Sequence, residues 1–495
     1  MISSGEHLPA LQVVLPLLAA PLMVLVRRGT FAWLLATAVS WGTLLIAVAL
    51  AARVREAGPI AYAIGNWPPP WGIEYRVDAV NAYVLVLVSL VASVVAPYAR
   101  ASIAAELPRD QRYLFFTMFS LCLAGLLGMT ITGDAFNLFV FLEISSLSTY
   151  VLIALGRDRR ALLAAYQYLV LGTIGATFYI IGVGLLYLMT GTLNIADLAA
   201  RLREVHELRP VLAALAFITV GIGLKLAMFP LHFWLPNAYA YAPSAITAFL
   251  AATATKVSIY VLLRLYFTVF AVRLVFEQLP MAQVLIALSV LAIVATSLVA
   301  VFQRDLKRMF AYSSVAQIGY ITLGAALVNE PGLTGAVAHL FNHGLTKGAL
   351  FLLLGGISLR LGGTGIDRVA GLARTMPLTS LGIVLAGLSL IGIPATAGFI
   401  SKWYFVLGAI EHGYAWLAVL IVATSLIALA YVWRFVEMAY LREPGPGAAN
   451  PREAPASMLI PAWIMVAGCI YFGLDTSFPV GGARLAAEVL LGGAR

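Results

Sequence analysis

Residues 136–155 read FNLFVFLEISSLSTYVLIAL, and this stretch decides the fold class of the chain. It contains a single charged residue, and about 20 apolar residues are enough to span the hydrocarbon core of a bilayer as a helix. A backbone in lipid must satisfy its own hydrogen bonds, so such a run must be helical. Apolar and polar residues do not alternate along it, which excludes a transmembrane β-barrel strand. The sequence therefore predicts an all-α integral membrane protein.

Similar apolar runs fill most of the 495 residues. The chain is 62% hydrophobic and 11% charged, whereas a soluble domain has roughly 25% charged residues. The first run has no basic region before it and no cleavage site, so we expect a span and not a signal peptide. About fourteen transmembrane helices are predicted, at residues 8–27, 30–51, 79–98, 113–131, 133–155, 163–190, 211–230, 244–267, 281–302, 309–328, 333–358, 377–400, 412–436 and 457–474.

Basic residues are divided unevenly between alternate loops. One alternate set holds seventeen Lys and Arg residues, and the other, with the C-terminal tail, holds nine. Cytoplasmic loops carry the excess of Lys and Arg, so the richer set is predicted to be cytoplasmic. Both termini then face outward, which requires an even number of spans. The net charge of +9 is scattered over these loops and therefore indicates orientation, not nucleic-acid binding.

Lysine is rare, and most of it lies in the apolar runs. The chain has 26 arginines and five lysines, of which only Lys307 is expected in a loop. A charge near the membrane centre costs at least ~2.5–3.5 kcal/mol. Arginine keeps its proton in proteins, whereas lysine can lose it when desolvated. We expect titratable cations inside the membrane and permanent cations outside, and predict proton-carrying roles for four lysines: Lys225, Lys256, Lys347 and Lys402. The alternative, above all for Lys402, is that the side chain reaches the headgroups.

Glu143 is the one acid in the middle of an apolar run. A lone buried glutamate would be neutral, while one beside a lysine can stay charged and exchange protons with it. We predict such an exchange, and a static structural ion pair is the alternative.

His339, His343 and Lys347 are spaced i, i+4, i+8 and so share one helix face. A neutral histidine both donates and accepts hydrogen bonds, which suits a proton relay. A static polar seam is one alternative. Haem ligation is another, but it would need a histidine from a second helix, for which His232 is the candidate.

Two predicted spans contain helix breakers next to a key lysine. In GLKLAMFPLHFWLP, Lys225 precedes Pro230 and Pro236, and in IGIPATAGFISKWY, Pro394 and Gly398 precede Lys402. Broken helices with free carbonyls in the membrane are typical of transporters.

These two spans are the seventh and the twelfth, so two five-helix units are predicted in inverted orientation. In the second unit only Gln317 and Tyr320 stand where an acid would match Glu143, and they are possible members of a polar axis. The predicted divisions are a three-helix segment at 1–98, the units at 113–267 and 281–436, and a C-terminal helix with a short tail at 457–495.

Four stretches resemble the antiporter-like subunits, a family that includes the D-type subunit of Mrp-type sodium/proton antiporters and proton-pumping membrane subunits of complex I and energy-converting hydrogenases. They are GDAFNLFVFLEISSLSTYVLIALG, KLAMFPLHFWLPNAYAYAPSAITAFLAATATKVSIYVLLR, HLFNHGLTKGALFLLLGG and GIPATAGFISKWYF. The resemblance covers roughly residues 75–440. It implies fourteen helices, inverted five-helix repeats, discontinuous helices 7 and 12, and a polar axis along the membrane midplane.

Carried onto this chain, the resemblance makes Glu143 and Lys225 a charge-coupled pair and Lys256 the central relay. His339 and His343 would neighbour Lys256, and Lys402 would be the distal site. One departure is WLPNAY, where many relatives have WLPDAH, so Asn237 and Tyr239 replace an acid and a histidine.

The first functional hypothesis is a D-type subunit of a Mrp-type antiporter in a bacterial or archaeal plasma (inner) membrane, with other membrane subunits as partners and protons and sodium as transported ions. The second is a pump subunit of a redox-driven complex of the NADH-quinone oxidoreductase or hydrogenase type. The chain has no GxGxxG motif, and its cysteines are two isolated residues, Cys122 and Cys469. We therefore expect no cofactor, no metal and no redox site of its own.

Overall fold

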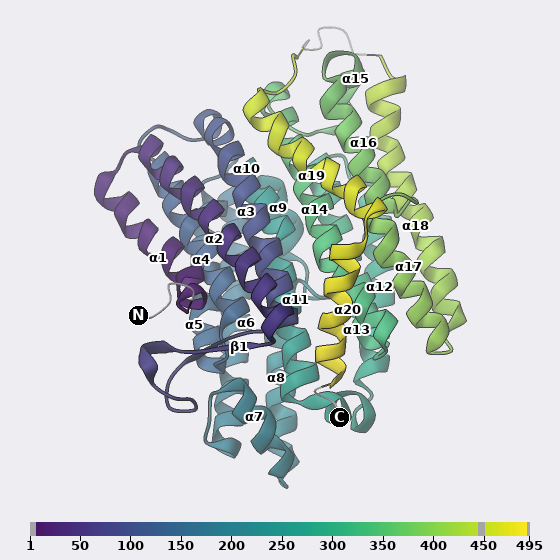
Figure 1. Ribbon diagram of the computed structural model, residues 1–495. Coiled ribbons are helices and arrows are strands. Elements are labelled where there is room, and N and C mark those ends of the chain that lie inside the picture. The colour runs from purple at the N-terminus through teal and green to yellow at the C-terminus, as the bar shows by residue number, and fades with distance from the viewer. Residues whose placement is uncertain (1–5, 444–450, 493–495) are drawn as a thin grey trace.

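The computed structural model describes residues 6–443 and 451–492. Within these ranges the protein is almost entirely helical (Figure 1). The helices and strands are α1 (Leu8–Val26), α2 (Gly29–Ala57), β1 (Ile60–Ala63), β2 (Glu74–Val77), α3 (Ala79–Glu106), α4 (Arg112–Ile131), α5 (Ala135–Ala154), α6 (Arg160–Thr190), α7 (Ile195–Arg201), α8 (Leu208–Leu226), α9 (Trp234–Tyr241), α10 (Ser244–Ala252), α11 (Ala254–Arg264), α12 (Met281–Val301), α13 (Leu306–Ala326), α14 (Glu330–Leu361), α15 (Leu372–Thr375), α16 (Pro377–Ile391), α17 (Ala397–Glu411), α18 (Ala415–Val436), α19 (Ala456–Leu474) and α20 (Ser477–Gly492).

Most of the fourteen predicted spans are present as long apolar helices. Within the described ranges, twelve helical segments are long and apolar enough to cross a membrane. The two remaining predicted spans are α13, which has 21 residues, and the interrupted pair α16–α17. The fold is therefore an all-α integral membrane fold, as predicted.

The two described ends of the chain lie on the same face of the bundle (Figure 1). His7, just before α1, contacts Tyr62 of β1 at 2.9 Å, and β1 pairs with β2 in an antiparallel hairpin. Val489 of α20 lines a pocket together with Arg76 of β2. We call this side the hairpin face and the other side the opposite face.

The seventh and twelfth spans are interrupted, as the prolines predicted. Helix α8 ends at Leu226, where Ala227 takes a left-handed conformation (φ 60°), and α9 begins seven residues later at Trp234. Helix α16 ends at Ile391, where Gly392 has φ 87°, and α17 begins at Ala397. Glycine accepts this conformation at little cost, whereas Ala227 adopts it with strain.

The eighth span is also interrupted, which the sequence did not indicate. Helices α10 and α11 meet at Thr253, whose φ of −126° and ψ of −56° are not helical. This run was predicted as one span at 244–267, and it contains no proline or glycine that would mark the break. The break frees backbone carbonyls beside Lys256.

The final span, α19, agrees with the prediction at 457–474, and a further helix follows it. Helix α19 ends with Gly473 packed so tightly on the α16–α17 break that an added Cβ would lie 2.4 Å from the Cα of Thr396. Helix α20 then continues toward the hairpin face, packed against α3 and α14 (Figure 1). The residues after 474 were expected to form a short tail, and up to Gly492 they instead form this helix.

Two predictions about basic residues are wrong. Lys307 lies in the first turn of α13, not in a loop, and is 5% exposed. Arg264 lies at the end of α11 with a side chain only 13% exposed, so permanent cations are not confined to the loops. Arg264 is tolerated inside because it pairs with Asp78 at the start of α3.

The two predicted five-helix units have matching turns on opposite faces. At the start of α5, Asp134 forms a single bridge with Asn194, which follows α6. At the start of α13, Asp305 forms the same kind of bridge with Gly365, which follows α14. The inverted repeat and the predicted divisions at 1–98, 113–267, 281–436 and 457–495 stay predictions.

Helices α6 and α8 pack closely through glycine, which gives a test of the fold. An added Cβ at Gly175 would lie 2.9 Å from the carbonyl oxygen of Gly221, whereas one at Gly184 meets nothing within 4 Å. Overpacking costs about 1–3 kcal/mol. We expect Gly175→Ala to lower the unfolding temperature of the purified protein. Gly184→Ala, which gains the same helix propensity, should leave it unchanged or raise it. Equal unfolding temperatures would contradict this packing.

Candidate functional site

Glu143 of α5 and Lys225 of α8 form an ion pair inside the bundle. Lys225 Nζ lies 3.8 Å from Glu143 Oε1, and it donates shorter hydrogen bonds to Ser146 Oγ at 2.7 Å and Tyr150 Oη at 3.3 Å. The Lys225 side chain is 3% exposed and that of Glu143 is 25% exposed. The Lys225 ammonium group is therefore bound mainly by neutral hydroxyls. The Glu143 carboxylate lies beyond hydrogen-bond distance but is close enough to form an ion pair.

Lys256 lies in the first turn of α11, directly after the break at Thr253, and is fully buried. Its Nζ donates to the carbonyl oxygen of Ala251 at 2.5 Å and lies 3.4 Å from Thr255 Oγ1. Ala251 belongs to the last turn of α10, directly before the break. Within the described chain, Lys256 forms no ion pair.

The predicted face of α14 is present. The rings of His339 and His343 stack with centroids 5.4 Å apart and an interplanar angle of 7°. His339 is held from both sides, by Ser401 Oγ at 2.6 Å and Gln317 Oε1 at 2.9 Å. Neither ring nitrogen of His343 has a hydrogen-bond partner among the described residues.

Lys347, one turn beyond His343, is fully buried. Its Nζ donates to the carbonyl oxygen of Phe310 at 2.7 Å and to Ser313 Oγ at 2.5 Å, both on α13. It therefore reaches a neighbouring helix and not the membrane surface.

Lys402 lies in α17, after the second break, and is 6% exposed. Its Nζ donates to the carbonyl oxygen of Ile391 at 2.8 Å and to Ser425 Oγ at 2.9 Å, and lies 4.9 Å from the centre of the Tyr320 ring. Ile391 is the last residue of α16. As at Lys256, an interrupted helix supplies the acceptor.

The titratable groups thus follow the packing of the helices. Helix α8 packs on α11, α10 packs on α14, and α14 packs on α17. On α14, His339 stacks on His343 and contacts Ser401, the neighbour of Lys402 in α17. The helices that carry the predicted residues therefore pack on one another in order from Glu143 to Lys402, and we call this set of residues the internal line.

The remaining predicted residues lie at the breaks or beside the line. Pro230 and Pro394 lie in the interrupted segments, and Pro236 is in α9. Gly398 packs so closely on α16 that an added Cβ would lie 1.8 Å from the carbonyl oxygen of Ser389. His232 stacks between Phe229 and Phe233, and its Nδ1 has no partner in the part of the chain that the structure describes.

Of the histidines considered for haem ligation, His339 has both ring nitrogens engaged in hydrogen bonds, and His343 has neither engaged with a described residue. Residues 6–443 and 451–492 contain no cluster of three or more His, Cys, Asp or Glu suited to a metal ion.

Sequence reasoning missed the neutral partners of the lysines. They are serines and a tyrosine on other helices, and only their proximity to an ammonium group distinguishes them from the many other polar residues of the spans: Ser146, Tyr150, Ser313 and Ser425.

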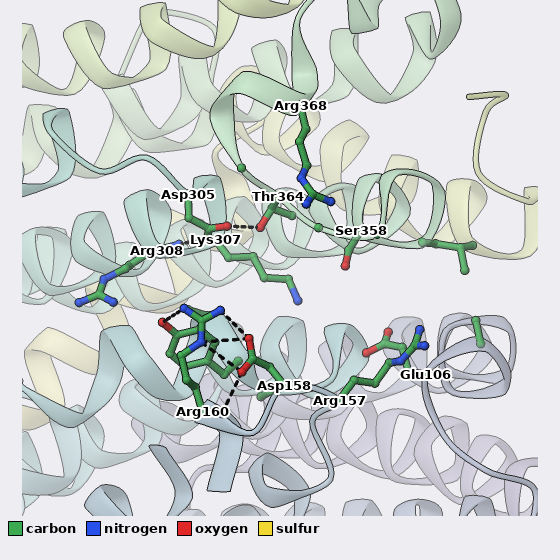
Figure 2. Close-up of a pocket in the computed structure, with 18 residues that line it drawn as sticks. Glu106, Arg157, Asp158, Arg160, Asp305, Lys307, Arg308, Ser358, Thr364 and Arg368 are labelled. Carbon is green, nitrogen blue, oxygen red and sulfur yellow. Dashed lines mark hydrogen bonds and ion pairs between the residues drawn. The ribbon is translucent and has the colours of Figure 1, made fainter. Parts of the chain in front are cut away.

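A pocket of about 660 Å³ opens on the opposite face, where α10 begins (Figure 2). The Lys307 side chain extends into it and its Nζ lies 3.2 Å from Ser244 Oγ, while Glu106 accepts a hydrogen bond from Ser244 N at 3.0 Å. On its wall, hydrogen bonds from Arg160 lower the pKa of Asp158. The pocket thus reaches the first residue of the span that carries Lys256.

Three comparisons with known proteins bear on this arrangement. The model of the NADH:quinone oxidoreductase/Mrp antiporter transmembrane family matches residues 132–428. The N subunit of NADH-quinone oxidoreductase from Desulforudis audaxviator is 46% identical, over 94% of this chain and 96% of the relative. The D-type subunit of the Na(+)/H(+) antiporter from Alkalihalophilus pseudofirmus is 31% identical, over 87% and 86%. A chain of the Mrp complex from Dietzia sp. DQ12-45-1b superposes with a TM-score of 0.90 at 26% identity, over 99% of this chain and 98% of that one.

The Glu143–Lys225 pair gives a second test. Glu143→Gln leaves the Lys225 ammonium without an anion and should destabilise the protein by about 1–3 kcal/mol, less than for a fully enclosed pair because Glu143 is partly exposed. Adding Lys225→Met removes the uncompensated charge and should recover part of this loss. Thermal unfolding of both purified variants measures the difference. A double variant less stable than the single one would contradict the ion pair.

Proposed function

Because this chain belongs to the NADH:quinone oxidoreductase/Mrp antiporter family, we propose that it is the D-type subunit of a multisubunit cation/proton antiporter and carries protons along its internal line. The observation that carries the proposal is the set of four buried lysines, Lys225, Lys256, Lys347 and Lys402, of which Lys225 alone forms an ion pair with a described residue. The others are bound by neutral oxygens.

Neutral acceptors suit a group that changes its charge. A carbonyl or hydroxyl oxygen accepts a hydrogen bond from both the ammonium and the neutral amine, so a lysine keeps its place in either state. A fixed ion pair would instead lose its attraction at every proton release. Arginine cannot take this part, because it keeps its proton.

Transfer begins at Glu143 and Lys225 in this proposal. When a proton reaches Lys256, the positive charge there favours release of a proton from a neighbouring positive group, since like charges repel in a medium of low dielectric constant. His343, with both ring nitrogens unpartnered among the described residues, is suited to pass a proton between Lys256 and Lys347 through bridging water. His339, fixed by Gln317 and Ser401, continues the line toward Lys402.

The partners are other membrane subunits, as in the multisubunit Mrp complex that superposes on this chain. Glu143 lies among exposed apolar residues of α5, including Val140 and Leu147. A neighbouring subunit that covers this surface would exclude lipid from the carboxylate and let its own charged groups act on the pair. Protons, with sodium as the coupled cation, are the proposed transported ions.

The protein is a multi-pass membrane protein of the family. We place it in a bacterial or archaeal plasma membrane with the hairpin face outward, because the opposite face carries the larger share of Lys and Arg. The opposite face still carries more Lys and Arg residues when Arg264 is counted with the hairpin face. Both described ends then lie outside.

A second candidate rests on the 46% identity to the N subunit of an NADH-quinone oxidoreductase. In that case the same internal line would move protons, and a partner enzyme would drive it. Purification of the complex under mild detergent and mass spectrometry of its subunits separates the two candidates. Small membrane subunits alone support the antiporter, and iron–sulfur or flavin subunits support the redox-driven complex.

Variants of the line test proton transport itself. Lys225→Ala and Glu143→Ala should each abolish proton-coupled transport in membrane vesicles while the complex still assembles. Lys256→Arg should also be inactive, because arginine keeps its proton. Dequenching of a pH-sensitive dye under an imposed ion gradient measures the flux.

Lys307→Arg is the matched control. Lys307 lies at the edge of a pocket open to one face, where a permanent charge is tolerated, so this variant should transport normally. Normal transport by Lys225→Ala and Glu143→Ala would show that the line is not the proton route. Full activity of Lys256→Arg would show that a fixed charge is sufficient at this position.

A further inference from the structure

A second pocket, of about 320 Å³, opens on the hairpin face at the other end of the span that carries Lys256. It is enclosed by the starts of α3 and α5, the end of α4, α7 and the end of α11, and its charged lining includes Asp78, Arg76 and Arg264. Tyr260 also lines it. The span α10–α11 therefore begins at one pocket and ends at another, with Lys256 between them.

Asp78 and Arg264 form a rigid buried pair at the inner part of this pocket. Asp78 caps α3 and accepts hydrogen bonds from Val80 N at 2.9 Å and Asn81 N at 3.3 Å. Arg264 Nη2 donates to Asp78 Oδ1, and the two side chains are 13% and 9% exposed. Because backbone amides hold the carboxylate, the guanidinium is held in place as well.

Tyr260 connects this pair to the region of Lys256. Lys256, Tyr260 and Arg264 are spaced four residues apart on α11 and so lie on one face of the helix, one turn above another. Tyr260 is 3% exposed, and its hydroxyl donates to the carbonyl oxygen of Thr130 at 3.0 Å. The same hydroxyl accepts from Arg264 Nε at 3.3 Å. Tyr260 thus fills the space between Lys256 and the pocket.

The chemistry of this stack opposes proton passage. Arg264 keeps its proton and cannot relay one. Asp78 is bound by Arg264 and by two backbone amides, which favour its charged form, so it does not take up a proton either. The Tyr260 hydroxyl has its proton committed to a backbone carbonyl.

We propose that Tyr260, Arg264 and Asp78 form a seal that closes Lys256 to the hairpin face and so directs its proton toward α14. This inference rests on the proposed role of Lys256 as a proton carrier. Asp78 compensates the charge of Arg264 enough to keep it inside the bundle, and Tyr260 excludes water from the path. Without the seal, the pocket would offer Lys256 a short route to the solution on that face, and the gradient would leak.

The test is passive proton leak through the purified complex in liposomes, with an imposed membrane potential and neither coupled cation nor electron donor present. Asp78→Asn with Arg264→Gln removes both charges together, so that no uncompensated charge is left inside. We expect the double variant to leak protons at least about tenfold faster than the unmodified complex, which corresponds to about 1.4 kcal/mol in the barrier. Adding Lys256→Met should abolish the extra leak, because the route passes through Lys256.

Glu330→Gln with Arg484→Gln is the matched control. This ion pair also lies on the hairpin face, but its side chains are 52% and 54% exposed and neither lines the pocket. Its removal should not change the leak. If the Asp78/Arg264 double variant fails to assemble, Tyr260→Ala opens the same path while both charges of the ion pair stay in place, and it should leak as well.

The seal is overturned if the double variant assembles and shows no extra proton leak. It is also overturned if Tyr260→Ala shows no extra proton leak. A leak that persists after Lys256→Met overturns the route through Lys256. The passive leak needs no coupled ion, so its outcome is independent of whether the complex is an antiporter. Normal transport by Lys225→Ala and Glu143→Ala would refute the proposed function and not the seal.

Discussion

The unfavourable free energy of an ammonium ion in the membrane interior is the constraint on which this structure depends. The protein meets it by breaking helices at the places where lysines need acceptors. The break between α10 and α11 leaves the Ala251 carbonyl free for Lys256, and the break between α16 and α17 leaves the Ile391 carbonyl free for Lys402. An intact helix would use those carbonyls internally. The breaks in these helices therefore supply hydrogen-bond acceptors for Lys256 and Lys402, in addition to shaping the bundle.

Two kinds of buried cation follow different rules in the same fold. Lys256, Lys347 and Lys402 are bound by neutral oxygens, so their surroundings tolerate both charge states. Arg264 is bound to a carboxylate that backbone amides hold in place. A permanent charge requires a permanent counter-charge, whereas a group that exchanges protons is better served by partners that do not change.

The span α10–α11 is the meeting point of these two arrangements. Its first residue, Ser244, contacts Lys307 and Glu106 at the pocket of the opposite face, and its last, Arg264, reaches the pocket of the hairpin face. Lys256 lies between the two pockets, beside α14. If the hairpin end is sealed, Lys256 can pass its proton to the histidines of α14 but cannot release it to the solution on the hairpin face. A proton that enters from the opposite face would then move along the plane of the membrane, through the internal line.

The sequence by itself determined the all-α membrane fold, most of the spans, the breaks at Pro230 and Pro394, and which lysines and which glutamate lie inside the bundle, because charge and proline in an apolar run carry a known free-energy cost. It also predicted that His339, His343 and Lys347 share a helix face, since that depends on spacing alone. Only the tertiary structure decided the rest. The break at Thr253 has no proline or glycine to mark it, and the serines that hold the lysines look like any polar residue of a span. The pairing of Arg264 with Asp78 joins residues 186 positions apart, and no local pattern specifies which acid will meet a buried cation when the helices pack.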